Sequence, residues 1–208
     1  MARPIIQFVR RAAKAEKKSV TKKAKAKPKP TIYEVTIPAG VTITVEEGGL
    51  VKVKGSKGEL SRKFSGAGMS VGKEDNKMIF LTPSKRKKDK AVVGAAQAHL
   101  KNMIHGVSEG VVYKMKIVYS HFPMNVKVQG DKLVIDNFLG EKYPRKAPLL
   151  KNVNVEIKGQ EVTLKGIDKE LVSQTAANIE QITKIKGRDL RVFQDGIYIT
   201  EKDGRKMV

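Results

Sequence analysis

The sequence contains no cysteine and no tryptophan, and aromatic residues make up only 5% of its 208 residues. The absence of cysteine excludes disulfide bonds, thiolate metal sites and cysteine nucleophiles. Histidine occurs three times, and His99 and His105 are spaced so that they fall on different faces of a helix, which does not suit a metal pair. No apolar run approaches the roughly 20 residues that a membrane-spanning helix needs. We therefore expect no metal site, no cofactor and no membrane span.

Sequence motifs of catalysis are also missing. The glycine-rich stretch GAGMSVG, residues 66–72, has glycines misspaced for a dinucleotide fingerprint, and no Gly-Lys-Ser or Gly-Lys-Thr phosphate loop occurs in the chain. We interpret Gly66, Gly68 and Gly72 as a flexible loop. Because we find no cluster of carboxylates or metal ligands either, the sequence predicts that the protein is not an enzyme and has no catalytic residues.

The first residues, MARPIIQFVRRAAKAEKK, contain no apolar core long enough for a secretory signal, and nothing that resembles a cleavage site follows them. A chain without cysteine also fits a reducing compartment. These two features together predict a cytoplasmic protein.

Acidic residues are scarce relative to basic ones, since 21 Asp and Glu stand against 42 Lys and Arg, a net charge of +21. Such a charge repels itself unless a polyanion neutralises it, and the usual polyanion is nucleic acid. Much of the charge lies in residues 1–30, a low-complexity segment that cannot bury enough apolar area to fold alone. We predict that this basic extension orders along phosphates; a solubilising tail or a linker is the alternative.

From Thr31 onward the sequence changes to short segments with one apolar face, which are typical of β-strands. A helix is predicted to begin with Asp89 as its N-cap and to end at Gly106. The strands predicted in this half are residues 33–37, 41–45, 50–54, 77–81 and 111–119.

The second half repeats this order of elements. Its strands are predicted at residues 125–128, 132–136, 152–158 and 161–165, and its helix is capped by Asp168 and stopped at Gly187. The helical segments DKAVVGAAQAHLKNM and DKELVSQTAANIEQI share their capping Asp and their apolar positions, which favours a duplication over coincidence. We predict an α+β fold of two tandem homologous domains, residues 31–118 and 119–208, each a mostly antiparallel sheet packed with one main helix, preceded by the basic extension 1–30.

Basic residues gather in segments that we expect to join strands. Loops with Lys, Arg and Gly can approach a sugar–phosphate backbone closely, because glycine removes bulk and the cations release condensed counterions. For the segment around residues 83–90, a solvated turn is an equally good interpretation. The candidate phosphate contacts from these segments are Lys63, Lys73, Lys85, Arg86, Lys142 and Arg145.

The predicted second helix carries uncharged amides, Gln174, Asn178 and Gln181, on its outward face. Amides can donate to phosphate oxygens and both donate to and accept from ribose hydroxyls, although an ordinary polar helix face explains them equally well. The scarcity of aromatic residues argues against a sheet that stacks single-stranded bases. It favours recognition of folded RNA through shape and backbone.

The segment TKIKGRDLRVFQDGIYI, residues 183–199, combines cations with apolar residues. We predict that Thr183–Lys186 finish the second helix, that Gly187 stops it, and that 188–191 form an RNA-facing loop. A closing strand is expected after the Asp195-Gly196 turn, although a tight hairpin across that turn is also possible.

Four long stretches, residues 99–123, 118–147, 166–189 and 191–201, resemble the archaeal and eukaryotic branch of the L6 family of large-subunit ribosomal proteins. The resemblance covers about residues 31–201 and implies two similar α+β domains that arose by duplication. It also implies a non-catalytic protein bound to large-subunit ribosomal RNA near the stalk base and the translation-factor binding region, with the second domain as main anchor. The RNA-binding residues that it implies are Gly166, Gln174, Asn178, Lys184, Lys186, Arg188 and Arg191.

The main hypothesis from the sequence is therefore a structural ribosomal RNA-binding protein of the large subunit, with neighbouring ribosomal proteins and translation factors close by and no homo-oligomer. The alternatives are a basic peripheral protein on an anionic membrane or scaffold, and a nucleic-acid enzyme. A membrane binder should gather its basic and apolar residues on one amphipathic helix, whereas the cations of this chain lie in predicted loops.

Overall fold

The computed structural model describes residues 31–207 except 47, 67, 75 and 85, so the basic extension 1–30 and Lys85 lie outside the described residues. The chain divides into two compact units. Within the described residues, the first unit comprises 31–38, 43–52 and 61–100, and the second comprises 39–42, 53–60 and 101–207.

Two three-stranded antiparallel sheets are built from the first six strands. Alternation along β6 buries Met78, Phe80 and Thr82, while the residues between them are less buried, and the Phe80 ring packs edge-on against Phe64 at 5.8 Å between centroids. One sheet has the order β1-β6-β5, from β1 (Thr31–Thr36), β5 (Ser70–Glu74) and β6 (Lys77–Thr82). The other has the order β2-β3-β4, from β2 (Thr42–Val45), β3 (Leu50–Gly55) and β4 (Gly58–Lys63).

The first long helix, α2 (Lys87–Ser108), is longer than the sequence predicts. Asp89 lies in its first turn rather than at the N-cap, because the Arg86 carbonyl already accepts hydrogen bonds from the amides of Asp89 and Lys90. Gly106 does not end the helix either. A Cβ at Gly106 would lie 2.0 Å from the carbonyl oxygen of Ile167, another residue of the second unit, so this glycine permits a close approach of two backbones.

The second unit contains a five-stranded sheet, a three-stranded sheet and one α-helix, α3 (Lys169–Ile182). The larger sheet has the order β11-β12-β7-β13-β14, from β7 (Val111–Val118), β11 (Val153–Lys158), β12 (Glu161–Gly166), β13 (Gly196–Lys202) and β14 (Arg205–Lys206). The smaller has the order β10-β9-β8, from β8 (Asn125–Gln129), β9 (Lys132–Asp136) and β10 (Arg145–Pro148), with the short 3-10 helix η1 (Phe138–Gly140) between β9 and β10.

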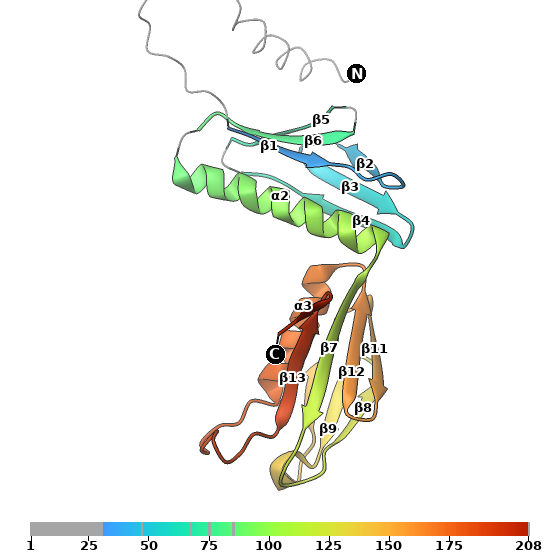
Figure 1. The fold of residues 1–208 in the computed structure, drawn as a ribbon, viewed down its shortest axis with the longest axis vertical. Helices are drawn as coiled ribbons and strands as arrows, with labels where there is room; N and C mark the ends of the chain where they lie inside the picture. The colour runs from blue at the N-terminus through green and yellow to red at the C-terminus, as the bar shows by residue number, and fades with distance from the viewer. Residues whose placement is uncertain (1–30, 47, 67, 75, 85, 208) are drawn as a thin grey trace, which may run out of the picture. The chain divides into compact units, whose positions relative to one another are not determined.

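Packing of α3 onto the strands forms the core of the second unit. Asp168 caps the helix by accepting a hydrogen bond from the Glu170 amide at 2.9 Å, as the sequence predicts. The helix buries Val172, Ala176 and Ile179 completely and contacts β7, β10, β12 and β13. Figure 1 shows α3 lying along the sheet, with its C-terminal end continuing into the loop that leads to β13.

The compact units of the structure divide differently from the predicted repeats, which meet at residues 118 and 119. Strand β7, which the sequence places at the end of the first repeat, pairs antiparallel with β12 and β13 and is the central strand of the second unit's sheet. Its alternating residues Val111, Tyr113, Met115 and Ile117 are buried. This alternation predicts a strand with one apolar face, but it carries no information about which helix will cover that face.

Further differences concern helix ends and short strands. Helix α3 ends at Ile182 rather than at Gly187, and beyond this end the Lys184 amide donates to the carbonyl of Gln181, three residues earlier, at 3.3 Å instead of continuing the helical pattern. The predicted glycine loop 66–72 contains the start of β5, and β4, β10 and β14 were also not predicted. Within the part of the chain that the structure describes, no helix is long and apolar enough to cross a membrane.

Candidate nucleic-acid interface

Two basic loops lie at the end of the second unit where β13 begins (Figure 1). The clamp loop, residues 137–146, contains η1 and leads into β10, and the α3–β13 loop, residues 183–195, joins the helix to its neighbouring strand. Nη1 of Arg145 donates to the carbonyl of Ile182, the last residue of α3, at 2.6 Å and to that of Lys184 at 3.5 Å, so it joins the clamp loop to the start of the α3–β13 loop. Cations that are separated by about 40 residues in sequence are therefore held on one surface.

Arg145 is the centre of this connection rather than an outward-facing cation. Its Nε donates to one carboxylate oxygen of Glu141 at 2.8 Å and its Nη2 to the other at 2.5 Å, which is a bidentate pair. Its guanidinium also lies over the ring of Phe138, 4.1 Å from the centroid. The sequence placed Arg145 among the phosphate contacts, but these internal partners give it a structural role.

Glu141 shows how strongly the two loops are coupled. The hydrogen bond from Arg145 is the main cause that lowers the pKa of the Glu141 carboxyl below its usual value, and the nearby charge of Arg188 lowers it further. Burial of the carboxyl acts in the opposite direction but is outweighed. The carboxylate is therefore ionised at neutral pH and remains available to hold Arg145.

The α3–β13 loop is anchored at both ends by buried residues. At its start, the Thr183 hydroxyl accepts a hydrogen bond from the Ile197 amide of β13 at 3.2 Å, and Ile185 is 7% exposed within the core. At its end, Asp195 is 1% exposed and accepts from the amide of Ser120 at 2.7 Å and from Nδ1 of His121 at 2.8 Å. These contacts hold both ends of the α3–β13 loop against the sheet.

The buried carboxylate of Asp195 stays ionised despite its burial. Burial raises the pKa of this carboxyl, but hydrogen bonds from the His121 side chain and from the amides of Ser120 and His121 together bring the pKa below its usual value. An ionised acceptor suits the donors that surround it, because charge-assisted hydrogen bonds are stronger than neutral ones.

Three side chains form a stack that supports the loop from inside. The imidazole of His121 is stacked on the ring of Phe193, with centroids 4.5 Å apart and an interplanar angle of 24°. The guanidinium of Arg188 lies over the same phenyl ring, 4.8 Å from its centroid. His121 is also hydrogen-bonded to Asp195, so the stack links Arg188 to a buried carboxylate.

The remaining predicted cations of these loops are exposed to solvent. They are Lys142 in the clamp loop and Lys184, Lys186, Arg188 and Arg191 in the α3–β13 loop. The carboxylate of Asp189 accepts a hydrogen bond from the Arg191 amide at 2.9 Å, which closes a tight turn within the loop. The arrangement is a surface of positive charge whose α3–β13 loop is anchored at both ends, and such a surface can bind the phosphates of a polyanion.

The other residues that were predicted in the second unit have mixed roles. Gln174 is exposed on α3 and donates to the side-chain oxygen of Asn178 at 3.0 Å, so the two amides form one polar pair on the helix surface. Gly166 is a packing residue, because a Cβ there would lie 2.6 Å from a methyl group of Val172.

Of the predicted cations described outside the second unit, Lys63 and Lys73 lie on strands rather than in loops, whereas Arg86 lies directly before the helix as expected. Lys63 is exposed at the end of β4, and Lys73 lies on β5, where its ammonium donates to the carbonyl of Ile43 at 3.2 Å. Both therefore belong to strands, not to a flexible loop. Arg86 is exposed directly before α2, and its amide donates to the Ser84 hydroxyl at 3.3 Å.

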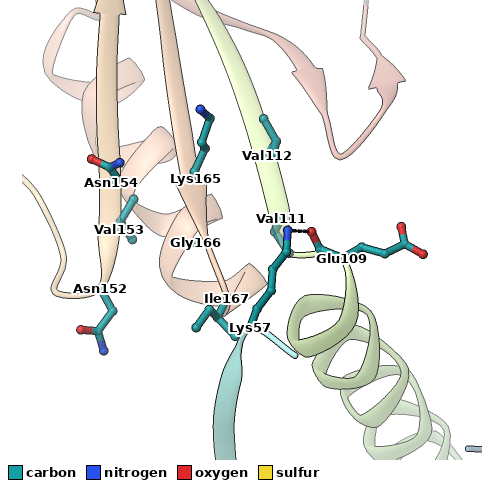
Figure 2. A pocket seen from close by; sticks show the side chains of 11 residues that line it. Lys57, Glu109, Val111, Val112, Asn152, Val153, Asn154, Lys165, Gly166 and Ile167 are labelled. Carbon is teal, nitrogen blue, oxygen red and sulfur yellow. Dashed lines mark hydrogen bonds between the residues drawn. The ribbon is translucent and has the colours of Figure 1, made fainter. Parts of the chain in front are cut away.

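An open cavity of about 670 Å³ lies elsewhere in the second unit (Figure 2). The ammonium of Lys57 donates to the carbonyl of Glu109, and Lys165 is paired with Glu156 at 2.8 Å, so both cations of the cavity wall are engaged within the protein. Among the residues that the structure describes, no group of three His, Cys, Asp or Glu side chains could hold a metal ion. The lining residues are Lys57, Glu109–Val112, Asn152–Asn154 and Lys165–Ile167.

Sequence reasoning missed several residues of the basic end. His121 and Asp195 are 74 positions apart, and no local pattern indicates that they will meet. Leu190 and Val192 are 61% and 59% exposed beside Arg191, although the sequence suggested that Val192 returns the chain to the core. Tyr143, between Lys142 and Arg145, is 79% exposed; a large aromatic residue within a basic stretch is the signal that could have found it.

Comparison with known proteins identifies the family. A sequence model described as ribosomal protein L6 matches residues 37–110 and 122–196, once in each half of the chain. The chain belongs to the ribosomal protein L6 family. The two matches confirm the predicted duplication, and together with the structure they confirm the predicted α+β fold.

Three similar relatives come from archaea, and each is named large ribosomal subunit protein uL6. The Methanobrevibacter smithii protein is 52% identical over 170 residues, which cover 82% of this chain and 95% of the relative. The Methanothrix thermoacetophila protein is 47% identical over 171 residues, covering 82% and 97% of the two chains. The Methanococcus vannielii protein is 48% identical over 172 residues, covering 83% and 94%. These likenesses confirm the archaeal-type branch for this L6-family protein.

Proposed function

We propose that this L6-family protein is a structural constituent of the large ribosomal subunit in the cytoplasm, and that it binds ribosomal RNA through the basic end of its second unit. The observation that carries this proposal is the pair of basic loops, which Arg145 joins and which Thr183 and Asp195 anchor to the sheet. The protein acts by neutralising phosphates and matching the shape of folded RNA, without catalysis.

The finer location follows from the family resemblance. The second unit is the main RNA anchor, close to the stalk base and to the region where translation factors bind, with other ribosomal proteins as neighbours. The amide pair of exposed Gln174 and half-buried Asn178 lies on the helix that leads into the α3–β13 loop, where it can bond ribose or phosphate oxygens. The exposed cations Lys63 and Arg86, and the basic extension 1–30, would add electrostatic contacts outside this anchor.

An anionic membrane fits this geometry less well than RNA does. Membrane-surface proteins present basic and apolar residues on one face of an amphipathic helix, whose apolar side enters the lipid. The cations of the second unit's basic end lie on loops, not on an amphipathic helix. Ile185 and Phe193 of these loops pack toward the core, whereas Leu190, Val192 and Tyr143 are exposed. Cations carried on two joined loops suit a shaped polyanion better than a fluid surface.

The test compares two triple variants that remove the same charge. Lys186→Ala, Arg188→Ala and Arg191→Ala together should weaken binding to large-subunit ribosomal RNA and make the log–log salt slope shallower by about 2 to 3, because each phosphate contact contributes about 0.7 to 0.9. The control is Lys151→Ala, Arg205→Ala and Lys206→Ala. These three residues are exposed. The strand register places them at the end of the sheet where Val153 pairs with Gly166 and Gly166 pairs with Val111, which is the end opposite the basic loops.

The control variant should bind RNA much more tightly than the loop variant at low salt, and the difference should shrink as the salt concentration rises. Equal weakening in the two variants would mean that net charge alone determines binding, and it would contradict the assignment of the interface. Circular dichroism of both variants should match that of the wild type, because the altered side chains are exposed.

A further inference from the structure

The clamp loop presents an aromatic ring in a way that phosphate binding does not explain. Tyr143 is 79% exposed, which is the highest value among the exposed large apolar side chains of the described residues. A single exposed aromatic residue on a protein surface would need no explanation. The exposure of Tyr143 is informative because the loop beneath the ring is held in place by specific contacts.

The loop holds Tyr143 at its apex by a clamp at its base. Glu141 and Arg145, two residues before and two residues after the ring, form the bidentate pair, and Arg145 is further fixed to the Ile182 carbonyl. Pro144 follows directly and restricts the backbone of residue 143 to extended conformations. The backbone that carries the ring is therefore ordered before any partner binds, so little conformational entropy remains to be lost.

The charge around the ring indicates the chemistry of its partner. Lys142 directly precedes Tyr143 and Lys146 follows it by three residues, both of them exposed, and the cations of the α3–β13 loop lie beside the clamp loop through the Arg145 contact. An exposed ring in a basic loop suits a nucleotide, whose base stacks on the ring while its phosphates meet the ammonium groups. An apolar protein pocket would need to desolvate these charges.

We propose that Tyr143 is a base-stacking residue that receives one unpaired base of large-subunit ribosomal RNA, with Lys142 and Lys146 contacting the adjoining phosphates. This inference rests on the proposed function and adds a contact that is independent of charge. The aromatic residues are too few for a stacking sheet, but one rigidly presented ring is enough to fix a single flipped or bulged base.

Equilibrium binding of the full-length chain to large-subunit ribosomal RNA from Methanobrevibacter smithii tests the inference. Tyr143→Ala should raise the dissociation constant about 5-fold to 100-fold, the range that loss of one stacked base produces, and Tyr143→Phe should stay within about twofold of the wild type. The salt slope should be unchanged in Tyr143→Ala but shallower by about 0.7 to 0.9 in Lys142→Ala. Since the ring is exposed, thermal unfolding of Tyr143→Ala should match that of the wild type.

A fluorescent variant reports stacking directly. The chain has no tryptophan, so Tyr143→Trp introduces a single indole whose emission should be quenched when a base stacks on it. Met207→Trp is the control, because Met207 is 50% exposed and follows β14 at the other end of the sheet, where no quenching is expected.

The outcomes separate the inference from the proposed function. If the wild-type chain failed to bind this RNA, both would be contradicted. If the wild type bound but Tyr143→Ala bound equally well, or if the indole at position 143 kept its full emission in the complex, only the stacking would be overturned. Loss of a neighbouring ribosomal protein from reconstituted particles with Tyr143→Ala, without any loss of RNA affinity, would overturn it in favour of a protein contact.

Discussion

Replacing Arg145 by Ala should separate its structural role from a role as a phosphate-binding cation. The substitution leaves the partly buried Ile182 carbonyl without its donor, which costs about 1 to 3 kcal/mol. It also removes the contact with the Phe138 ring, worth about 0.5 to 1 kcal/mol, and the pair with Glu141, worth about 0.5 kcal/mol because that carboxylate is partly exposed and screened by solvent. We expect the second unit to lose about 2 to 4 kcal/mol of stability in total.

Hydrogen exchange of the α3 and β10 amides measures this loss, and RNA titrations at several salt concentrations measure its effect on binding. Arg145→Ala should weaken RNA binding several-fold through disorder of the loops while leaving the salt slope unchanged. Arg145→Lys keeps the charge but not the planar fork, so it should recover only a small part of the stability and affinity. If Arg145→Lys behaved like the wild type and Arg145→Ala lowered the slope by about 0.7 to 0.9, Arg145 would be a phosphate contact and the clamp would be refuted.

Three further predictions follow from particular contacts. Because the folded protein lowers the pKa of Asp195, the carboxylate contributes stability that is present above about pH 4 and lost as the pH falls through the lower folded value. Asp195→Asn should therefore lower the free energy of unfolding by about 1 to 3 kcal/mol at pH 7. It should also reduce the loss of stability that the wild type shows at acid pH, and an equal loss in the variant would contradict this. Gly106→Ala should destabilise α2 because its Cβ would clash with the Ile167 carbonyl, whereas Gly94→Ala, with open space around it, should stabilise by up to about 1 kcal/mol; equal effects in thermal unfolding would refute the close approach. Phe193→Leu should remove the stack that supports Arg188 and weaken RNA binding a few-fold at an unchanged salt slope, and full affinity in this variant would show that the stack is dispensable.

The sequence predicts the helices and strands of this fold well where the interactions that define them join residues close together in the chain. The alternation in β6 and β7 is visible as period-two hydrophobicity, and the Asp168 cap acts on an amide only two residues away. The early end of α3 is different, because the chain leaves the helix where the Thr183 hydroxyl accepts a hydrogen bond from the Ile197 amide of β13, a tertiary contact that competes with the expected glycine stop. Such competition depends on geometry that residue types alone do not fix.

The sequence predicts which segments of the candidate site are basic, but not which cations of those segments are exposed. Clusters of Lys and Arg mark the segments that we expect to contact a polyanion, and Lys186, Arg188 and Arg191 are exposed in the structure. Whether a given cation faces outward depends on partners that are distant in sequence. Arg145 is used internally because Ile182, 37 positions away, presents its carbonyl to it. Nothing in the local sequence distinguishes Arg145 from Lys142.

The most direct test of the central claim is crosslinking of this protein to RNA within assembled large ribosomal subunits, read at the level of single residues. Crosslinks should concentrate in residues 142–146 and 184–191, on the two loops that Arg145 holds together. Crosslinks confined to the first unit, with these loops contacting only protein or solvent, would contradict it.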